Sequence, residues 1–375
     1  MKIEQANWDL ASGWTNRGRA LPGSEVTFVL VFGGRAALEK AERFHELRAR
    51  YPRAELLLAS TSGNIAGIEI SDTGLVATAV IMEKTRIACA AHNVTDPSES
   101  RQLGADLARQ LNSPGLVHIL VLSDGGITNG AELARGINSV LPPDVLVTGG
   151  LAGDGTKFER TLVGLNEPPV PGRVVALAFY GTQFRSTFGS AGGWKPFGPD
   201  RIVTRSDGNR LFELDGSSAL NLYKQYLGDQ AAGLPGTALR FPLSVTPADG
   251  SPAVVRTILS IDEAAGSMTF AGDIPPGARV RFMHASYEDL LDGATQAAEQ
   301  THALDCDLAV CVSCVGRRIV LGQRTEEEIE LVRESVGPRA VITGFYSYGE
   351  LAPAEAATNC RLHNQTMTVT AFTEE

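Results

Sequence analysis

Apolar residues recur along the chain in short runs that alternate with polar, turn-forming segments. The first run, Val26–Phe32, is rich in β-branched residues and ends at Gly33-Gly34, which predicts a buried strand followed by a turn. Ala36–Arg50 then spaces apolar residues among charged ones, as an amphipathic helix does. Glu55–Ser60 is the next apolar run. The chain is therefore expected to begin its main fold with a strand, a helix and a second strand.

Two neighbouring apolar runs and a capping signal come next. Leu75–Met82 and Arg86–Asn93 flank a charged pair at 83–84, which predicts an antiparallel hairpin. Asp96 precedes a proline and, three residues on, Glu99, the pattern of a helix N-cap with a capping box. Leucines at 103, 107 and 111 then repeat at four-residue spacing, so a helix buried on one face is expected.

The rest of the chain continues this mixture of strands and helices. Further strands are expected at Leu116–Leu122, Val145–Thr148, Val174–Tyr180, Gln183–Ser190, Ala253–Ser260, Ser267–Ala271, Arg279–Met283 and Asp307–Val315. Further helices are expected at Thr128–Val140, opened by Thr128, at Asp215–Leu227, with Asp215 as N-cap, at Glu288–Leu304, and after Thr325 as N-cap, with Glu326–Glu328 in the first turn. Consecutive strands beside strand–helix–strand crossings indicate an α+β fold of two halves, in which mixed and antiparallel sheets are layered with helices.

Composition and charge restrict the class of protein. The 375 residues are 43% hydrophobic and 20% charged, as in a globular chain. A formal net charge of −10 argues against nucleic acid and anionic membranes as partners, because both require clustered Lys and Arg. Met1–Ser24 has no apolar core of a signal peptide, and no apolar segment approaches the ~20 residues that span a bilayer. We therefore expect no membrane insertion and a cytoplasmic location.

The cysteines and histidines predict no metal centre. The five cysteines favour reduced thiols, and the spacing of Cys306, Cys311 and Cys314 resembles an iron–sulfur motif. However, residues three apart on one strand point to opposite faces, so Cys311 and Cys314 are expected to diverge. The six histidines include no pair at helical metal-ligand spacing. His118 lies in an apolar strand, where a hydrogen-bonded core imidazole is expected.

Several short motifs occur in a fixed order in the second part of the chain. The segment Trp194–Leu220 contains an aromatic-Pro-x-Gly-Pro sequence. It also contains the sequence Glu-Leu-Asp-Gly, which comes directly before a predicted helix. Ser313–Arg317 reads SCVGR, Gly344–Glu350 reads GFYSYGE, and His363–Thr366 reads HNQT. In these motifs the chain resembles the FIST domain pair, a two-part ligand-sensing module found alone or fused to bacterial signalling outputs.

The resemblance implies an organisation and a function. It implies an N-terminal extension at residues 1–25, an N-type FIST domain at 26–228 and a C-type domain at 229–375. Because no output domain is recognised, the expected function is a stand-alone sensor that binds a small molecule, such as an amino acid or another carboxylate, and acts on a signalling protein. An enzyme acting in the cleft between the halves is the alternative from another class.

Some relatives in this family bind haem and sense nitric oxide, so the resemblance also raises haem as a cofactor. An axial ligand would have to be a His, Cys or Tyr. His284, His363, Cys314 and Tyr348 are all candidates, and the sequence does not choose among them. The cofactor therefore remains unassigned at this point.

Polar and aromatic residues within the motifs predict a ligand-binding cleft between the two halves. An arginine can hold a carboxylate in a bidentate fork, and aromatic walls with one acid suit a zwitterionic ligand. The predicted lining from the C-terminal half is Arg317, Tyr346, Tyr348, Glu350 and His363, and the predicted N-terminal rim is Ser62, Asn64, Gly150 and Asp154, within the turns 60–64 and 149–154. The alternative is that these motifs only hold the two halves together.

Overall fold

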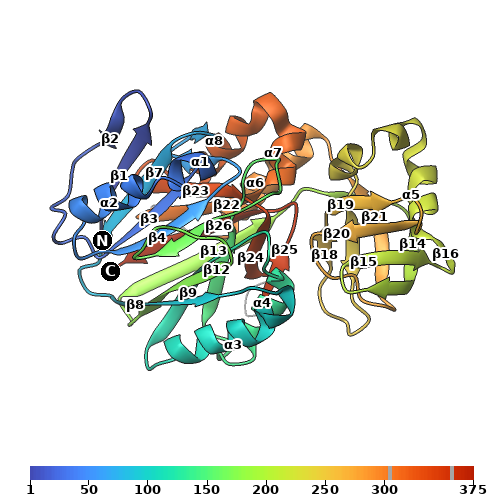
Figure 1. Cartoon of the computed structure of the whole chain (residues 1–375), viewed down its shortest axis with the longest axis horizontal. Coiled ribbons are helices and arrows are strands. Elements are labelled where there is room, and N and C mark those ends of the chain that lie inside the picture. Colours follow the sequence, from blue (N-terminus) through green and yellow to red (C-terminus); the bar gives the residue numbers. More distant parts are fainter. Residues whose placement is uncertain (303–305, 355–358) are drawn as a thin grey trace.

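The computed structural model describes residues 1–302, 306–354 and 359–375 (Figure 1). It consists of a large body of three six-stranded sheets with helices on their outer faces, and a smaller lobe of antiparallel strands. The two chain ends meet in the large body, where the terminal amino group lies 3.3 Å from Glu374. The structure confirms an α+β fold with mixed and antiparallel sheets.

The first sheet of the large body has the strand order β11-β4-β3-β7-β1-β2. Its central strands β3 and β4 are parallel and are joined by two helices. The bounds are β1 (Lys2–Asp9), β2 (Gly13–Arg17), β3 (Phe28–Gly33), α1 (Arg35–Leu38), α2 (Ala41–Arg50), β4 (Glu55–Ser60), β7 (Leu75–Ile81) and β11 (Val163–Leu165). Every residue of β3 and β7 is buried, because both faces of this sheet are covered.

The second sheet has the order β25-β24-β10-β9-β12-β8, again with a parallel central pair, β9 and β10. Its elements are β8 (Arg86–Asn93), the 3₁₀ turn η1 (Pro97–Glu99), α3 (Ser100–Leu111), β9 (Leu116–Ser123), α4 (Gly130–Asn138), β10 (Leu146–Leu151), β12 (Arg173–Tyr180), β24 (Gly349–Pro353) and β25 (Cys360–His363). Helices α3 and α4 pack together over the outer face.

The third sheet has the order β13-β26-β22-β23-β5-β6, and its parallel pair is β22 and β23. Its elements are β5 (Asn64–Ala66), β6 (Glu69–Ser71), β13 (Phe184–Ala191), α6 (Tyr287–Glu299), β22 (Leu308–Cys314), α7 (Val315–Leu321), η4 (Gly322–Arg324), α8 (Thr325–Val336), β23 (Val341–Ser347) and β26 (Met367–Glu374). The inner faces of the three sheets share one apolar core, to which they contribute Phe32, Phe179 and Phe345 respectively.

The three sheets repeat one arrangement. In each, two parallel strands joined by helices are followed by two antiparallel strands, in the orders β4-β3-β7-β1, β10-β9-β12-β8 and β23-β22-β26-β13. Each unit also sends one edge strand to another unit's sheet: β5 pairs with β23, β11 with β4, and β24 with β10. The large body is therefore a pseudo-threefold assembly whose units exchange edge strands in a cycle.

A ring of backbone hydrogen bonds closes this cycle where the second parallel strand of each unit ends. In every bond the accepting carbonyl belongs to the last or second-last residue of the strand in one unit, and the amide two residues beyond the equivalent position in another unit donates to it. The bonds are Ser62 N to Tyr346 O at 2.8 Å, Gly153 N to Ser60 O at 2.9 Å and Tyr348 N to Leu151 O at 3.0 Å. Positions 60, 151 and 346 are thus structurally equivalent.

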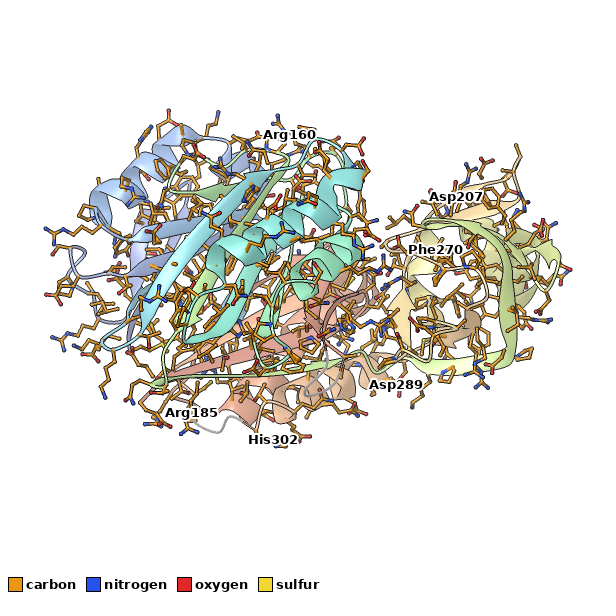
Figure 2. All side chains as sticks on the ribbon, turned by 90° about the horizontal axis from the view of Figure 1, so that it is seen from below. Arg160, Arg185, Asp207, Phe270, Asp289 and His302 are labelled. Atoms are coloured by element: carbon orange, nitrogen blue, oxygen red, sulfur yellow. The ribbon has the colours of Figure 1, made fainter. Side chains whose placement is uncertain are left out.

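The small lobe is inserted between β13 and α6 and has its own core, which includes Phe270, Phe282 and Tyr223. Figure 2 shows it set beside the body, with Phe270 and Asp207 in the lobe. Its elements are β14 (Lys195–Asp207), β15 (Arg210–Leu214), β16 (Ser217–Ser218), α5 (Ala219–Leu227), η2 (Gly228–Gly233), η3 (Gly236–Arg240), β17 (Leu243–Thr246), β18 (Val254–Arg256), β19 (Ile258–Asp262), β20 (Ser267–Phe270) and β21 (Arg279–His284). The predicted boundary at residue 228 follows α5 within this lobe and stays a prediction.

The predicted hairpin at Leu75–Met82 and Arg86–Asn93 is wrong. Strand β7 lies in the first sheet and β8 in the second, so the turn between them carries the chain from one unit to the next. The turn is fixed from outside, because the Glu374 carboxylate accepts the backbone amides of residues 83, 84 and 85 at 2.8–2.9 Å. Alternating strand and turn signals cannot distinguish this arrangement from a hairpin.

One predicted helix cap is confirmed and three are corrected. Asp96 caps η1 in a capping box with Glu99, directly before α3. Helix α4 is capped by Asn129, not Thr128, since the side-chain Oδ1 of Asn129 accepts the backbone amides of Ala131 and Glu132 at 3.1 Å. Thr325 is the first residue of α8, and its hydroxyl donates to the carbonyl of Gly322, so it is not the N-cap.

The third correction concerns the helix expected from Asp215. Helix α5 begins at Ala219 after the N-cap Ser218. Asp215 adopts a left-handed turn with φ 50° and accepts the amide of Ile202 at 2.9 Å, so it joins two strands. Helix α6 ends at Glu299, and Leu304, the predicted end, lies outside the described residues.

The predictions for His118 and the cysteine strand are confirmed. Cys311 lies in β22 and packs toward the outer core with Ala309, while the alternate residues of the strand face the central core, so Cys311 and Cys314 diverge. His118 is fully buried between Ser186 Oγ at 3.0 Å and Thr148 Oγ1 at 3.1 Å. In the described part of the chain, we find no helix with the length and apolar character needed to cross a membrane.

Candidate functional site

A cavity of about 880 Å³ opens where strands of all three units end. It lies at the carboxyl ends of β3, β4, β10 and β22, an edge of the sheets at which α/β proteins commonly bind ligands. Its walls come from both halves of the chain. The apolar lining residues are Trp8, Leu10, Ala36, Ala37, Val315 and Ile319, and the charged ones are Arg35, Glu39, Lys40, Asp72, Asp154, Lys157 and Arg318.

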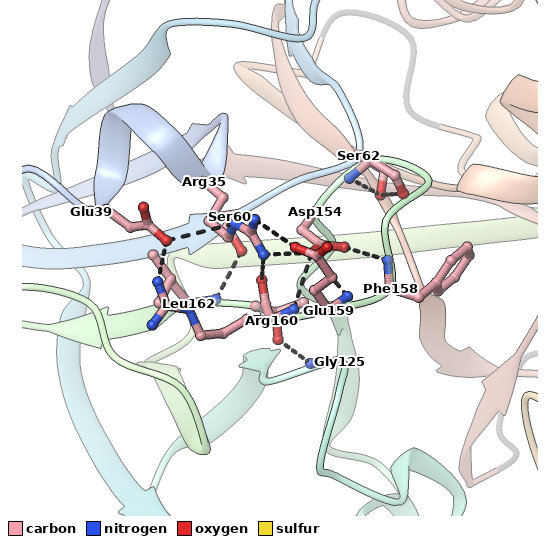
Figure 3. Close-up of polar contacts among 12 residues, drawn as sticks. Arg35, Glu39, Ser60, Ser62, Gly125, Asp154, Phe158, Glu159, Arg160 and Leu162 are labelled. Atoms are coloured by element: carbon pink, nitrogen blue, oxygen red, sulfur yellow. Dashed lines mark hydrogen bonds and ion pairs between the residues drawn. The ribbon is translucent and has the colours of Figure 1, made fainter.

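Asp154 organises the loop that follows β10 (Figure 3). Its carboxylate accepts the backbone amides of Phe158 at 2.9 Å, Glu159 at 3.1 Å and Arg160 at 3.0 Å. Three amides converging on one carboxylate fix the loop as a tight turn around a buried negative charge. The sequence signal for this turn was limited to a glycine-rich stretch after a predicted strand.

Two side chains from other units complete the surroundings of Asp154. Arg35 Nη1, from the first unit, lies 2.9 Å from its carboxylate, and the Tyr348 hydroxyl, from the third unit, also donates to it. Burial acts to raise the pKa of Asp154, but these hydrogen bonds and the backbone amides outweigh it and lower the pKa. Asp154 is therefore an ionised carboxylate that joins all three units beside the cavity.

Ser62 and Thr61 form the floor of the cavity at the end of β4. The Ser62 hydroxyl donates to the carbonyl of Gly155 at 3.0 Å and lies 3.2 Å from the amide of the same residue. A side chain at Gly153 would come within 2.3 Å of that hydroxyl, so only glycine allows this close approach. Thr61 accepts the amide of Gly63 at 3.3 Å.

Arg318 forms the wall contributed by the C-terminal half. Its guanidinium pairs with both carboxylate oxygens of Asp72, and Nη1 also donates to the carbonyl of Ser62. The guanidinium carbon lies 5.3 Å from the ring centroid of Tyr346, in a cation–π arrangement. The sequence pointed to a neighbouring arginine, Arg317, because adjacent motif residues cannot be assigned to a face before the helix is placed.

Arg317 lies in a closed polar network behind the cavity wall. Its side chain is fully buried and contacts Glu328 at 2.6 Å, and it also donates to the carbonyls of Gly192 and Leu290 at 2.7 Å. The Tyr346 hydroxyl donates to the same carboxylate at 2.9 Å, and burial raises the pKa of Tyr346 far above its usual value. These contacts fasten α6, α7, α8 and β23 to one another.

Glu350 and His363 pair with each other in register on β24 and β25 and are also buried. Burial raises the pKa of Glu350 to about 8, against the lowering effect of hydrogen bonds from Ser347 and Thr366. Burial lowers the pKa of His363 to about 4, and its Nε2 lies 3.0 Å from the carbonyl of Ala352. Neither side chain lines the cavity.

The structure therefore brings together part of the predicted site. Ser62 and Asp154 line the cavity, and Tyr348 contacts Asp154 from behind. Asn64 is buried in β5, where it pairs with Phe345, and Gly150 is packed inside β10 against Val312. Arg317, Tyr346, Glu350 and His363 are buried and make internal contacts outside the cavity lining.

The cavity does not offer a haem site. None of its described lining residues is a His, Cys or Tyr, and charged side chains occupy much of its wall. Of the four candidate axial ligands, His363 and Cys314 are buried elsewhere, the Tyr348 hydroxyl is bonded to Asp154, and His284 belongs to the small lobe. Within the described residues, no group of three or more His, Cys, Asp or Glu side chains is placed to hold a metal ion.

Comparison with known proteins gives two family matches. The FIST N domain model matches residues 27–217 and the FIST C domain model matches residues 219–353. No curated protein matches the chain. Among solved structures, a cyanuric acid hydrolase from A. caulinodans is similar over 99% of this chain and 98% of its own, with 8% identity and a TM-score of 0.34. That similarity is too low to carry an inference.

Proposed function

Since the chain belongs to the FIST family, whose domains are associated with sensory signal transduction, we propose that it senses a small zwitterionic molecule, such as an amino acid, in the cavity at the strand ends. The ligand state would be passed to a separate signalling protein, and a cytoplasmic location belongs to the same proposal. The observation that carries it is a cavity between the two halves whose walls combine apolar side chains with fixed charges of both signs.

The distribution of charge supports a ligand with one positive and one negative group. Arg318 and Arg35 present guanidinium groups from opposite halves of the chain, and Asp72 and Asp154 present the neighbouring carboxylates. A ligand carboxylate would take donors of Arg318 in a bidentate fork, and a ligand ammonium would take oxygens of Asp72. The ligand thus replaces part of an existing ion pair, which limits the net cost of removing the charges from water.

The apolar wall supports a ligand with a hydrophobic side chain. Trp8 and Val315 line the cavity, and Ile319 and Leu10 are exposed, Leu10 at 92%. Covering such side chains with a ligand contributes favourable burial of apolar surface. A cavity of about 880 Å³ is large enough for an amino acid together with ordered water.

The lining residues support binding rather than catalysis. The hydroxyl of Ser62 is engaged on both sides by the backbone of Gly155, and no histidine lines the cavity within the described residues. A serine nucleophile needs a base within hydrogen-bond reach. Asp154 is unsuited to that role, because its oxygens accept the amides of its own loop and a guanidinium.

Trp8 provides a direct test by fluorescence. The protein is titrated with a panel of amino acids, and with matched amides that lack the carboxylate and acids that lack the ammonium group. We expect saturable changes in tryptophan emission for one or more amino acids, with much weaker changes for both kinds of matched compound. Arg318→Gln should weaken binding about tenfold or more, equivalent to about 1.4 kcal/mol.

Arg109→Gln is the matched control, because Arg109 lies on the outer helix α3 and pairs only with its neighbour Asp106 among the described ion pairs. The Arg109→Gln variant should bind the amino acid with the same affinity as the wild type. If no amino acid binds, or if the Arg318 variant binds as tightly as the control, the proposed ligand class is wrong.

A further inference from the structure

A second cavity, of about 560 Å³, lies between the small lobe and the large body. Its walls are formed by α4 and β25 of the body and by β18 and two proline-containing loops of the lobe. None of its described lining residues also lines the cavity at the strand ends. It is therefore a separate place in the molecule, and its chemistry can be read independently of the proposed sensory site.

This lobe–body cavity carries an excess of positive charge. Arg135, Arg256 and Arg361 line it, and Asp249 is the single carboxylate among its described lining residues. Arg135 is already paired with Asp273 at 2.9 Å and with Glu132. Among the described ion pairs none involves Arg256 or Arg361, although Asp273 acts electrostatically on Arg256 and Asp249 on Arg361.

Arg256 is a fixed positive charge in the wall of this cavity. It is 5% exposed, and among the described residues the acceptors of its guanidinium are all backbone carbonyls, of Leu362 at 3.0 Å and of Val255 at 3.2 Å, with a longer contact to Asp273 O. Burial lowers the pKa of Arg256 to about 10; Asp273 opposes this shift, and Arg361 and Arg135 add to it. Carbonyl contacts satisfy its hydrogen bonds without neutralising its charge.

Arg361 reaches the cavity from β25 and is only partly buried. Its Nη1 donates to the carbonyl of Pro252, and no described hydrogen bond uses Nη2 or Nε. The two remaining nitrogens can therefore offer the paired donors that match a carboxylate or phosphate. Prolines at 247, 252, 275 and 276 stiffen the facing loops, so these loops lose little conformational entropy when a ligand binds.

We propose that the lobe–body cavity binds the oxyanion group of a small ligand, a carboxylate or a phosphate, with Arg361 as the forked donor and Arg256 as the fixed charge behind it. Such a ligand would touch α4 and β25 of the body together with β18 of the lobe. An oxyanion placed there balances positive charge of the three arginines that the nearby carboxylates balance only in part, and the contacts of the lobe with the body become stronger when it is bound.

Isothermal titration of the full-length protein with inorganic phosphate and, separately, with succinate tests the proposal at low ionic strength. At least one anion should bind with saturable heat, and Arg361→Gln should weaken that binding at least tenfold. Arg205→Gln is the matched control, since Arg205 pairs with Glu213 on the surface of the same lobe, and its affinity should not change. Binding of phosphate alone or of succinate alone identifies the ligand group.

Asp249→Asn provides an independent variant, because it removes the carboxylate that competes with the anion and should tighten binding at least threefold. This variant reports on the site even if the Arg361 variant is poorly folded, as checked by near-UV circular dichroism. Three outcomes would overturn the proposal: no binding of either anion to the wild type, unchanged affinity of the folded Arg361 variant, or unchanged or weaker binding by the Asp249 variant.

Discussion

At the scale of single residues, Glu350 shows how a buried carboxyl can remain in the fold without a cation. Its oxygens lie 2.6 Å from Ser347 Oγ and 2.9 Å from Thr366 Oγ1, and Ser347 Oγ is also 3.3 Å from the carbonyl of Ser313. One serine proton cannot serve both acceptors. A protonated Glu350 that donates to Ser347, which then donates to Ser313, satisfies every group, in agreement with its pKa of about 8.

The raised pKa predicts how stability changes with pH. Between the ordinary value of 4.5 and about 8 the folded protein retains a proton that the unfolded chain has released, so the free energy of unfolding falls as pH rises through this interval. The contribution approaches about 1.4 kcal/mol per pH unit. Glu350→Gln keeps a neutral donor and should flatten this slope.

The measurement is urea unfolding at half-unit steps from pH 6.5 to 8. His363 and His118, whose pKa values are lowered from 6.5, still raise stability with pH near pH 6.5, but they do so equally in both proteins, so the difference between the two slopes reports Glu350. Parallel slopes for the wild type and the Glu350 variant would show that Glu350 is ionised in the folded protein.

The sequence identified which motif residues are unusual but not the surroundings of each one. Arg317 and Arg318 are consecutive on α7, and a helix rotates about 100° per residue, so one enters the core and the other reaches the cavity. Motif spacing alone does not distinguish them. By contrast, the Asp96 cap depends only on neighbouring residues, and it was predicted correctly.

At the scale of elements, the parallel strand pairs of the second and third units both require a glycine at one position. Gly149 in β10 and Gly344 in β23 adopt φ of 145° and 154°, and an added Cβ would lie 1.9 Å from the carbonyl oxygen of Val121 or Cys311 on the paired strand. The two glycines occupy equivalent positions, because each lies two residues before the carbonyl, of Leu151 or Tyr346, that accepts a hydrogen bond of the ring.

Replacing either glycine with alanine should be costly for both steric and conformational reasons. We expect Gly149→Ala and Gly344→Ala each to lower the free energy of unfolding by about 3 kcal/mol or more. Gly236→Ala is the control, since an added Cβ there has no neighbour within 4 Å and its φ is not positive; its effect should stay within about 0.5 kcal/mol. Denaturant unfolding measures all three, and a small loss at Gly149 or Gly344 would contradict the close approach.

Most individual elements could be predicted from periodicity, while their pairing could not. The runs that form β3, β4, β7 and β8 all carry clear strand patterns. Yet β7 and β8 belong to different sheets, and β5, three residues long, pairs with β23 nearly 280 residues away. Hydrophobic patterns record which face of a strand is buried, but not which distant strand supplies its hydrogen bonds.

At the scale of the whole molecule, the edge strands lock the three units together. The first unit supplies β5 to the third sheet, the second supplies β11 to the first, and the third supplies β24 to the second. No short sequence repeat accompanies this pseudo-symmetry, because each strand needs only a suitable apolar pattern. The three units therefore share the pairing of their strands but not their amino-acid sequences.

The small lobe stands outside this cycle, so its removal should leave the large body folded. Lys195 and His284 are register partners at the base of the lobe, which places the entry and exit of the chain side by side. A variant in which residues 196–283 are replaced by a short glycine linker needs no rearrangement of the body. The three sheets keep all their strands, since the lobe contributes none to them.

We expect this deletion variant to unfold cooperatively and to retain amino-acid binding at the strand-end cavity, because no residue of the lobe lines that cavity. It should lose oxyanion binding at the lobe–body cavity, because Arg256 and both facing loops are removed with the lobe. Denaturant unfolding and the two titrations measure these outcomes separately. If the variant instead unfolds without cooperativity, contacts between the lobe and the body are needed to complete the third unit. One such contact is the hydrogen bond that the side-chain amide of Gln365 donates to the carbonyl of Leu239 at 3.1 Å.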